Sequence, residues 1–329
     1  MKKCLVIAVL MTISVSVLAQ ETDSIPSKSM ILVKKVTDQF PNTRFIDVHF
    51  EQLGSSDYES ELFGTPYQTG TIESETRVRA AMNLPIVQKD TRILSASLRY
   101  GYRDINFGQA NVPSGASPII GVAESQSFHY FFGSVNYTRY DRLFGKTLVS
   151  NLSVFGDASD KKFGVLNAAY VASFVLKRNT QTTTTIGLVL QSNPNAVFPI
   201  LPAFSYEHQF KDSPWRIDMI LPKQLYFRRN LLTGGRLSIG TVFEGEPFYF
   251  ITDGLGDGDV LYNFNRNEIR SGLMYEYKIY EGLILSLRTG WNYFLNGTIR
   301  ERGQTKEIST TSFDPNFYVN FGVSFNLIN

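Results

Sequence analysis

The sequence predicts an all-β protein, a transmembrane antiparallel up-and-down β-barrel of about fourteen strands. The stretch Phe317–Ile328 alternates apolar and polar residues for about eleven positions, a length normal in outer-membrane barrels and uncommon in soluble sheets. The chain contains 25 Phe and 17 Tyr, yet its mean hydropathy is −0.10, close to neutral. This dilution is expected of a barrel, because only every second side chain of each strand meets lipid.

The N-terminus has the form of a secretory signal peptide. Lys2 and Lys3 precede the apolar run Leu5–Leu18, and Val17-Leu18-Ala19 gives a small-residue cleavage site. The run is too short for a comfortable transmembrane helix, and no second candidate follows it. We therefore expect three parts: a signal peptide over 1–19, a periplasmic lead-in over 20–42 and an outer-membrane barrel over 43–329.

Composition excludes several classes of site. Cys4 is the single cysteine and lies before the apolar run, so the mature chain has no disulfide, lipoprotein anchor or cysteine-based metal centre. Without Lys2 and Lys3, 30 basic residues face 30 acidic ones, so the net charge of the mature chain is zero. We expect no nucleic-acid partner, no metal and no cofactor.

Alternating segments follow one another along the chain and define the strands. Thirteen are apparent, in the order Arg44–Leu53, Ile72–Leu84, Ile93–Arg103, Ser125–Arg139, Thr147–Phe155, Asn167–Leu176, Thr182–Gln191, Val197–Phe210, Trp215–Leu221, Gly235–Phe243, Ile269–Ile279, Leu283–Tyr293 and Phe317–Ile328. Single-chain bacterial barrels have even strand numbers. An added crossing at Leu225–Arg229, after an outer turn at Pro222-Lys223, gives the preferred fourteen; twelve is the alternative.

The connections set the orientation. In such barrels the short turns are periplasmic and the long loops external. The short connections lie at 142–145, 177–181, 211–214 and 280–282, and the long ones at 107–124, 252–264 and 297–312. The final strand should run down from the last loop and close the barrel against the first strand.

Charged residues share one face of several strands, and that face should line the lumen because charges facing lipid cost several kcal/mol in total. The predicted lumen-lining residues are Glu73, Glu75, Arg77, Arg79, Arg99, Arg103, Arg216, Asp218, Arg236, Arg270, Glu276, Lys278 and Arg288. They form either a salt-bridge lattice that fills a narrow lumen or a solvated pore with excess Arg that favours anionic solutes. Barrels of this size fall between filled and open ones, so size does not decide.

Aromatic residues mark the membrane interfaces. Trp291 and Tyr293 end one apolar band, Tyr275 and Tyr277 flank a tight turn at the other side, and Trp215 begins a strand. Ten residues at about 3.3 Å each, tilted about 40°, span roughly the 25 Å of the apolar band. The sequence therefore predicts contact with outer-membrane lipid along this band.

No catalytic residue is expected. The histidines are His49, His129 and His208, and Ser127 is the nearest same-face partner of His129. The surroundings lack a lipase pattern, so an interfacial histidine in an aromatic girdle is the simpler interpretation of His129. The run Asp253–Asp259 resembles part of a calcium loop, but Phe264 occupies the position of the terminal Glu, which favours a glycine-rich external loop.

One region resembles a known family. The stretches Leu201–Tyr206, Trp215–Pro222 and Tyr226–Arg228 are similar to the signature of an uncharacterised bacterial outer-membrane β-barrel family, catalogued as a domain of unknown function. The resemblance covers most of the mature chain. It implies a barrel fold in the outer membrane of a Gram-negative cell and no activity.

The sequence favours a narrow channel or uptake barrel for small polar or anionic solutes over an enzyme. The alternative is a structural or surface-interaction barrel with a plugged lumen, and the third hypothesis is a lipid hydrolase. Expected partners are outer-membrane lipid, the barrel-assembly machinery and small solutes. The chain ends Leu327-Ile328-Asn329, so Phe325 would stand in for the terminal aromatic of similar barrels.

Overall fold

The computed structural model describes residues 40, 43–121, 123–192, 199–231, 234–252, 255 and 260–326. The predicted signal peptide, nearly all of the predicted lead-in, most of the Asp253–Asp259 run and Leu327–Asn329 lie outside the described residues. Within the described residues no helix is long and apolar enough to cross a membrane. The elements are β1 (Ile46–Leu53), β2 (Ser56–Leu62), β3 (Thr65–Lys89), β4 (Arg92–Phe107), β5 (Ser125–Leu143), β6 (Lys146–Ser159), β7 (Phe163–Arg178), β8 (Thr182–Gln191), β9 (Ile200–Gln209), β10 (Trp215–Leu221), β11 (Gln224–Leu231), β12 (Gly235–Phe250), β13 (Tyr262–Tyr280), β14 (Leu283–Glu301), β15 (Glu307–Phe313) and β16 (Asn316–Phe325).

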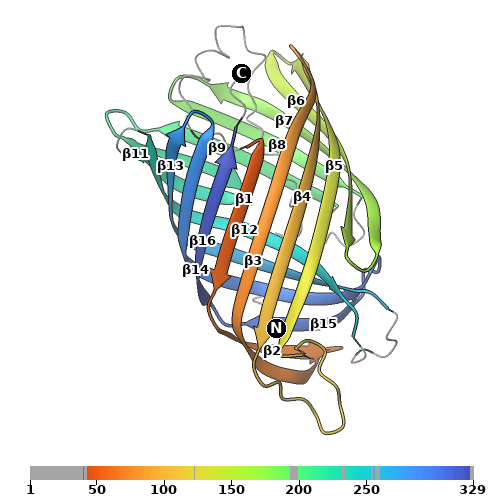
Figure 1. The fold of residues 1–329 in the computed structure, drawn as a ribbon. Coiled ribbons are helices and arrows are strands. Elements are labelled where there is room, and N and C mark those ends of the chain that lie inside the picture. The colour runs from red at the N-terminus through yellow and green to blue at the C-terminus, as the bar shows by residue number, and fades with distance from the viewer. Residues whose placement is uncertain are drawn as a thin grey trace.

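The strands form a closed antiparallel barrel of fourteen crossings (Figure 1). From β3 to β14 each strand pairs with the next, β16 pairs with β14 and β1, and β1 pairs with β3. In register, His49 of β1 lies opposite Gly322 of β16. The predicted fourteen strands and the predicted closure between the first and last strands are both confirmed.

Two crossings are each broken into two segments. β1 and β2 both pair with β3, and β15 and β16 both pair with β14, so each pair counts as one crossing. The breaks lie at Gly54-Ser55 and Asp314-Pro315, and proline has no N–H for the ladder. Beyond the breaks β2 pairs with β15, and Figure 1 shows these two strands turned across the end of the barrel. Much of the loop predicted at 297–312 is therefore strand, and so is most of the polar stretch 55–68 between the first two predicted strands.

The two ends of the barrel differ, and we name them by their connections. The turn end carries short turns at 90–91, 144–145, 179–181, 210–214 and 281–282; the loop end carries 63–64, 108–124, 160–162, 222–223 and 302–306. Phe144 and Gly145 both have positive φ, 51° and 71°, as a two-residue type I′ hairpin requires. The predicted extra crossing after Pro222-Lys223 is present as β11.

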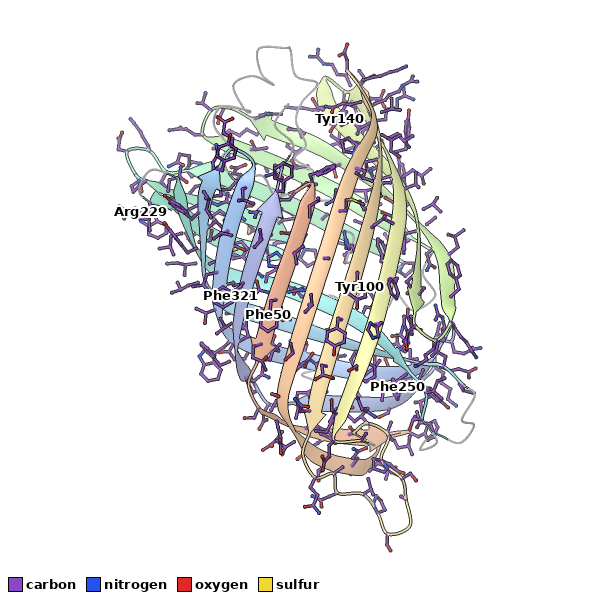
Figure 2. All side chains as sticks on the ribbon, in the orientation of Figure 1. Phe50, Tyr100, Tyr140, Arg229, Phe250 and Phe321 are labelled. Atoms are coloured by element: carbon purple, nitrogen blue, oxygen red, sulfur yellow. The ribbon has the colours of Figure 1, made fainter. Side chains whose placement is uncertain are left out.

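Apolar side chains cover the outside of the wall. In β16 Phe317, Phe321 and Val323 are exposed, whereas Tyr318 and Asn320 between them are buried. Figure 2 shows Phe50 and Phe321 on neighbouring strands, where they are register partners. The alternation that predicted the fold thus separates an outer apolar face from an inner polar one.

The wall is uneven in height. β8 to β11 contain seven to ten residues, whereas β12 contains 16 and β13 contains 19. Phe243–Phe250 of β12 therefore pairs with β13 alone, and its end meets β5 and β6. Phe248 lies 4.6 Å from Phe128 between ring centroids, and the Tyr249 hydroxyl donates to Asp157. This contact of β12 with β5 and β6 narrows the barrel at the loop end.

Candidate functional site: a filled barrel interior

An apolar cluster fills the interior at the loop end. We call it the apolar plug, and its buried members are Tyr58, Ile72, Ile105, Phe107, Ile119, Ile120, Phe248, Tyr262, Phe264, Ile299 and Phe313. They come from β12 to β15 and β2 to β4, which are successive neighbours at the loop end of the wall, and from the loop after β4. Ile105, Ile119 and Ile299 are at most 1% exposed. Burial this complete means that side chains occupy the lumen at this level.

Gln68 of β3 fixes the loop part of the plug. Its amide oxygen accepts from the Ile119 N–H at 2.8 Å, and its amide nitrogen donates to the Ile120 carbonyl at 2.7 Å. The same nitrogen donates to the Tyr58 hydroxyl at 2.7 Å. Because Gln68 is 2% exposed, these bonds are made away from water and each of them satisfies a buried polar group. One side chain thereby holds the loop down onto the plug.

A network of buried ion pairs lies directly below the plug. We call it the ion lattice, and it consists of Glu51, Glu75, Arg77, Arg266, Glu268 and Arg270. Arg77 of β3 donates to both carboxylate oxygens of Glu268 in β13, at 2.9 and 2.8 Å. Its Nε donates to Glu75 at 2.5 Å. The two-pronged pair links two strands that β1, β16 and β14 separate in the wall.

Two further arginines complete the lattice. Arg266 contacts Glu75 at 2.6 Å and Glu268 at 3.0 Å, while Arg270 contacts Glu51 at 2.7 Å and Glu268 at 2.8 Å. All side chains of the lattice are 1–3% exposed. Arg266 also lies over the rings of Phe294 and Phe313, at 4.9 and 5.2 Å from their centroids, which joins the lattice to the plug. Buried charges need such partners, because an unpaired one costs several kcal/mol.

The lattice has a wetter edge toward the turn end. Glu244 of β12 contacts Arg79 at 2.7 Å, Arg270 at 2.9 Å and Arg288 at 3.3 Å. The side chains of Glu244, Arg79 and Arg288 are 19%, 24% and 22% exposed, against 1–3% in the lattice. These side chains are therefore less tightly enclosed than those of the lattice.

Smaller ion pairs lie nearer the turn end. Asp218 and Arg228 are 2.7 Å apart, and Glu276 contacts Arg236 at 2.7 Å as well as Arg44. The Arg236 guanidinium also donates to the Phe40 carbonyl at 3.1 Å and lies over the ring of that residue. Phe40 is 3% exposed. Phe40 therefore lies inside the barrel, beside the ion pair of Arg236 and Glu276.

The structure places most of the predicted lumen residues on the inner face. Three of them, Glu75, Arg77 and Arg270, belong to the lattice, and Arg79 and Arg288 border it. Arg103 contacts Glu75 at 3.2 Å, and Arg99 lies over the inward Phe132 ring. The remaining inner residues, Asp218, Arg236 and Glu276, lie toward the turn end. Arg216 pairs with the half-exposed Glu207 at 2.9 Å, and Lys278 is partly buried. Glu73 departs from the pattern and is exposed. A bulge between Ile72 and Ser74 changes the phase of the strand, so Ile72 points into the plug and Glu73 does not.

Sequence reasoning missed several interior charges. Glu244, Arg266 and Glu268 lie just beyond the predicted ends of their strands, because β12 and β13 continue seven residues further toward the loop end than predicted. Glu51 lay inside a predicted strand, on the same face as Asp47 and His49, but was not included among the predicted lumen residues. Extending the period of two from Arg270 through Glu268 to Arg266 would have found two of them.

The predicted interface aromatics lie on the outer face at both ends. Tyr277, Trp291 and Tyr293 are 42%, 52% and 44% exposed. Tyr275 is opposite Leu287 and Trp291 opposite Ser271, so the Tyr275/Tyr277 pair lies toward the turn end and the Trp291/Tyr293 pair toward the loop end. Trp215 begins β10 at the turn end and is partly buried, 5.9 Å from the Arg229 guanidinium.

The histidines are engaged with neighbours that do not form a nucleophilic site. The Ser127 hydroxyl donates to Asp104 at 2.7 Å, while His129 Nδ1 bonds the Tyr100 hydroxyl at 2.9 Å and its ring contacts Tyr102. His208 bonds Thr182 at 2.8 Å. His49 lies inside, with its two ring nitrogens on Asn320 at 2.9 Å and Asp47 at 3.0 Å. In the described part of the chain, no three His, Cys, Asp or Glu side chains are grouped to hold a metal ion.

A cleft opens on the surface of the loop end. Its volume is about 680 Å³, and it lies between β2, β3, β14, β15 and the loop after β4. The lining combines two carboxylates, one aromatic ring and many hydroxyl and amide groups: Glu59, Ser60, Glu61, Pro66, Tyr67, Gln68, Thr69, Asn111, Val112, Pro113, Leu295, Asn296, Thr310, Thr311 and Ser312. Such a lining offers hydrogen bonds to a polar ligand.

A family described as "Domain of unknown function (DUF6268)" matches residues 148–326, which include the resembling stretches between 201 and 228. No curated protein matches the chain. Among solved structures, an outer membrane channel of Pseudomonas putida F1 is 10% identical, with a TM-score of 0.38, covering 84% of this chain and 94% of that one. A Pseudomonas aeruginosa FadL homologue is 8% identical, with a TM-score of 0.41 and coverages of 86% and 90%. The outer membrane protease OmpT of Escherichia coli is 7% identical, with a TM-score of 0.27 and coverages of 86% and 96%.

Proposed function

The chain belongs to the DUF6268 family, a domain of unknown function, and we propose that it is an outer-membrane barrel held closed at the loop end. The arrangement of its interior side chains is the basis of this proposal. In this proposal the loop end faces outward, as the short turns at the other end favour. The apolar band of β16 and its neighbours supports the membrane location, since Phe317, Phe321 and Val323 would otherwise be exposed to water. The barrel presents its loop-end cleft to ligands at the cell surface and does not conduct polar solutes at rest.

The observation that carries the closure is the succession of plug and lattice. A solute that enters at the loop end meets Ile299 and Phe264, which are at most 2% exposed, and then Arg77 and Glu268 joined inside the lumen. Opening a path requires separating charges that have no water to replace their partners, which costs several kcal/mol for each pair broken. Thermal motion alone does not supply this often enough for steady conduction.

Swelling of liposomes that contain the purified barrel tests the closure. With a small neutral sugar and with a small anion outside, the proposal expects swelling rates equal to those of protein-free liposomes. Rates that rise in proportion to the amount of wild-type barrel would contradict it.

A gated narrow channel is the second candidate, and the wetter edge at Arg79, Glu244 and Arg288 favours it, because these side chains are 19–24% exposed. Replacing residues 109–121 by a short Gly-Ser linker removes Ile119 and Ile120 from the plug. Swelling of liposomes that contain this variant, without swelling of liposomes that contain the wild type, would support gating by the loop. Impermeability of both would leave the closed barrel.

A further inference from the structure

A row of four polar side chains lines the loop-end cleft. Ser312 of β15 is opposite Glu59 of β2, and Glu59 is in turn opposite Thr69 of β3. Thr69 forms an isolated bridge with Asn111 of the loop after β4, which extends the row by one position. Register partners of antiparallel strands point to the same face, and all four residues are exposed. The row therefore crosses three strand spacings, about 14 Å, on one side of the sheet.

The segments that carry this row are tied to one another. The backbones of Thr69 and Asn111 exchange two hydrogen bonds, at 3.0 and 2.8 Å. The Tyr67 hydroxyl donates to the Ser117 carbonyl at 2.9 Å, so β3 holds the same loop at a second point. On the other side of the cleft, β2 and β15 are joined by their backbone ladder (Figure 1). A cleft whose walls are already ordered loses little conformational entropy when a ligand binds.

Several polar groups of the cleft are open to a ligand. Among the described residues, the Glu59 carboxylate and the Asn111 side-chain amide form no hydrogen bond or ion pair, and neither does the carboxylate of Glu61, the next residue on that face of β2. No Lys, Arg or His belongs to the lining that the described residues provide. A phosphorylated, sulfated or carboxylated ligand would therefore meet two like charges and no opposite one.

We propose that the loop-end cleft binds a neutral oligosaccharide, an inference that rests on the proposed position of this end at the cell surface. Each sugar hydroxyl both donates and accepts, so one ligand can serve the Glu59 carboxylate and the Asn111 amide of the same row. An amine ligand only donates and would leave the Asn111 N–H groups without an acceptor.

The rest of the lining suits the same ligand. The Tyr67 ring and the side chains of Pro66 and Pro113 offer apolar surface to the C–H faces of sugar rings. The cleft volume of about 680 Å³ lies within the range of small-ligand sites, about 300–1,000 Å³. The cleft thus combines hydrogen-bonding groups in a row with apolar surface beside them.

Binding of the purified wild-type barrel, in detergent, to an array of immobilised neutral, sulfated and amino-sugar oligosaccharides tests the proposal. Neutral members should be bound and sulfated ones should not. Isothermal titration with the free form of the strongest neutral member should show saturable binding that is the same at low and high salt, because screening weakens only interactions between charges.

Two substitutions place the binding in the cleft. Glu59→Ala removes a charged acceptor and should weaken binding by about ten- to a hundredfold, and Asn111→Ala should weaken it by about two- to tenfold. Glu59→Gln keeps a carbonyl acceptor and should bind more tightly than Glu59→Ala. The matched control is Glu73→Ala, because Glu73 is an exposed carboxylate of β3 that does not line the cleft, and it should bind as the wild type does.

Three results would overturn the proposal. They are the absence of binding to every neutral oligosaccharide by the wild type, wild-type affinity in both Glu59→Ala and Asn111→Ala, and salt-sensitive binding of amino sugars or spermidine alone. Heat-modifiable migration on gels checks that each variant is folded. Liposome swelling tests the closed lumen separately: a barrel that binds oligosaccharide but swells liposomes would contradict the closure and leave the cleft assignment, and one that does neither would contradict the cleft assignment alone.

Discussion

Arg77 and Glu268 meet inside the barrel, where each of the two terminal guanidinium nitrogens donates to one carboxylate oxygen, at 2.9 and 2.8 Å. The pair joins β3 to β13, whose closest connection around the wall runs through β1, β16 and β14. The inner charges of this barrel therefore join strands that are not neighbours in the wall.

Removing one member of the lattice should destabilise the barrel strongly. Glu268→Gln keeps the shape but leaves Arg77, Arg266 and Arg270 with less carboxylate charge in a site without water. We expect a loss of about 3–5 kcal/mol in the free energy of unfolding, measured by urea titration of the refolded barrel.

The matched control for Glu268→Gln is Glu207→Gln. Glu207 pairs with Arg216 at 2.9 Å but is 50% exposed, so its loss should cost about 0–1 kcal/mol. Equal costs for the two variants would show that the lattice does not carry the stability assigned to it.

Gln68 should control access to the loop after β4. Gln68→Leu removes the bonds to Ile119 and Ile120 and leaves their buried backbone groups unsatisfied, at about 1–3 kcal/mol each. We expect proteinase K to cut within 108–124 much faster than in the wild type, as mass spectrometry of the fragments would show. Gln304→Leu, in the exposed turn after β14, should leave that cleavage unchanged.

Gly297 leaves space for two rings of the plug. A Cβ at this position would lie 2.6 Å from Phe264 and 3.0 Å from Phe313, closer than side chains tolerate. Gly297→Ala should therefore destabilise the barrel by about 1–3 kcal/mol through displaced rings. Gly133→Ala, whose Cβ would meet nothing nearer than Leu98 at 3.6 Å, should unfold at nearly the wild-type urea concentration. Similar midpoints for both variants would argue against a tightly packed plug.

Paired cysteine variants test the two faces of β16. Cys4 is the single cysteine and lies in the predicted signal peptide, so in a barrel produced without residues 1–19 each substitution gives a unique label. Phe321→Cys, at a position 57% exposed, should react with a fluorescent maleimide and be quenched by lipids that carry a quencher in their tails. Asn320→Cys, at a position 4% exposed, should remain unlabelled until the barrel is unfolded. Labelling of both positions in folded barrels would contradict the assigned faces.

Alternation of apolar and polar residues predicted the barrel and the pairing of β1 with β16, and the even strand number of such barrels was needed to reach fourteen crossings. It was also enough to place Arg77 and Arg270 on one face, because the period of two holds through both of those segments. The pattern gave the wrong face for Glu73, because a bulge changes the phase of β3 there. It also gave ends too early for β12, which continues beyond Phe243, and a start too late for β13, which begins before Ile269. The plug was not predictable, since Ile119 and Ile120 reach it from a loop whose path depends on Gln68.

Recording from single wild-type barrels in a planar lipid bilayer tests most directly whether the lumen is closed. With the plug and the Arg77–Glu268 pair in place, insertion should produce no step in current above the bare membrane at moderate voltage. A stable conductance step that grows linearly with voltage would show that ions pass through the resting barrel, and would contradict the account.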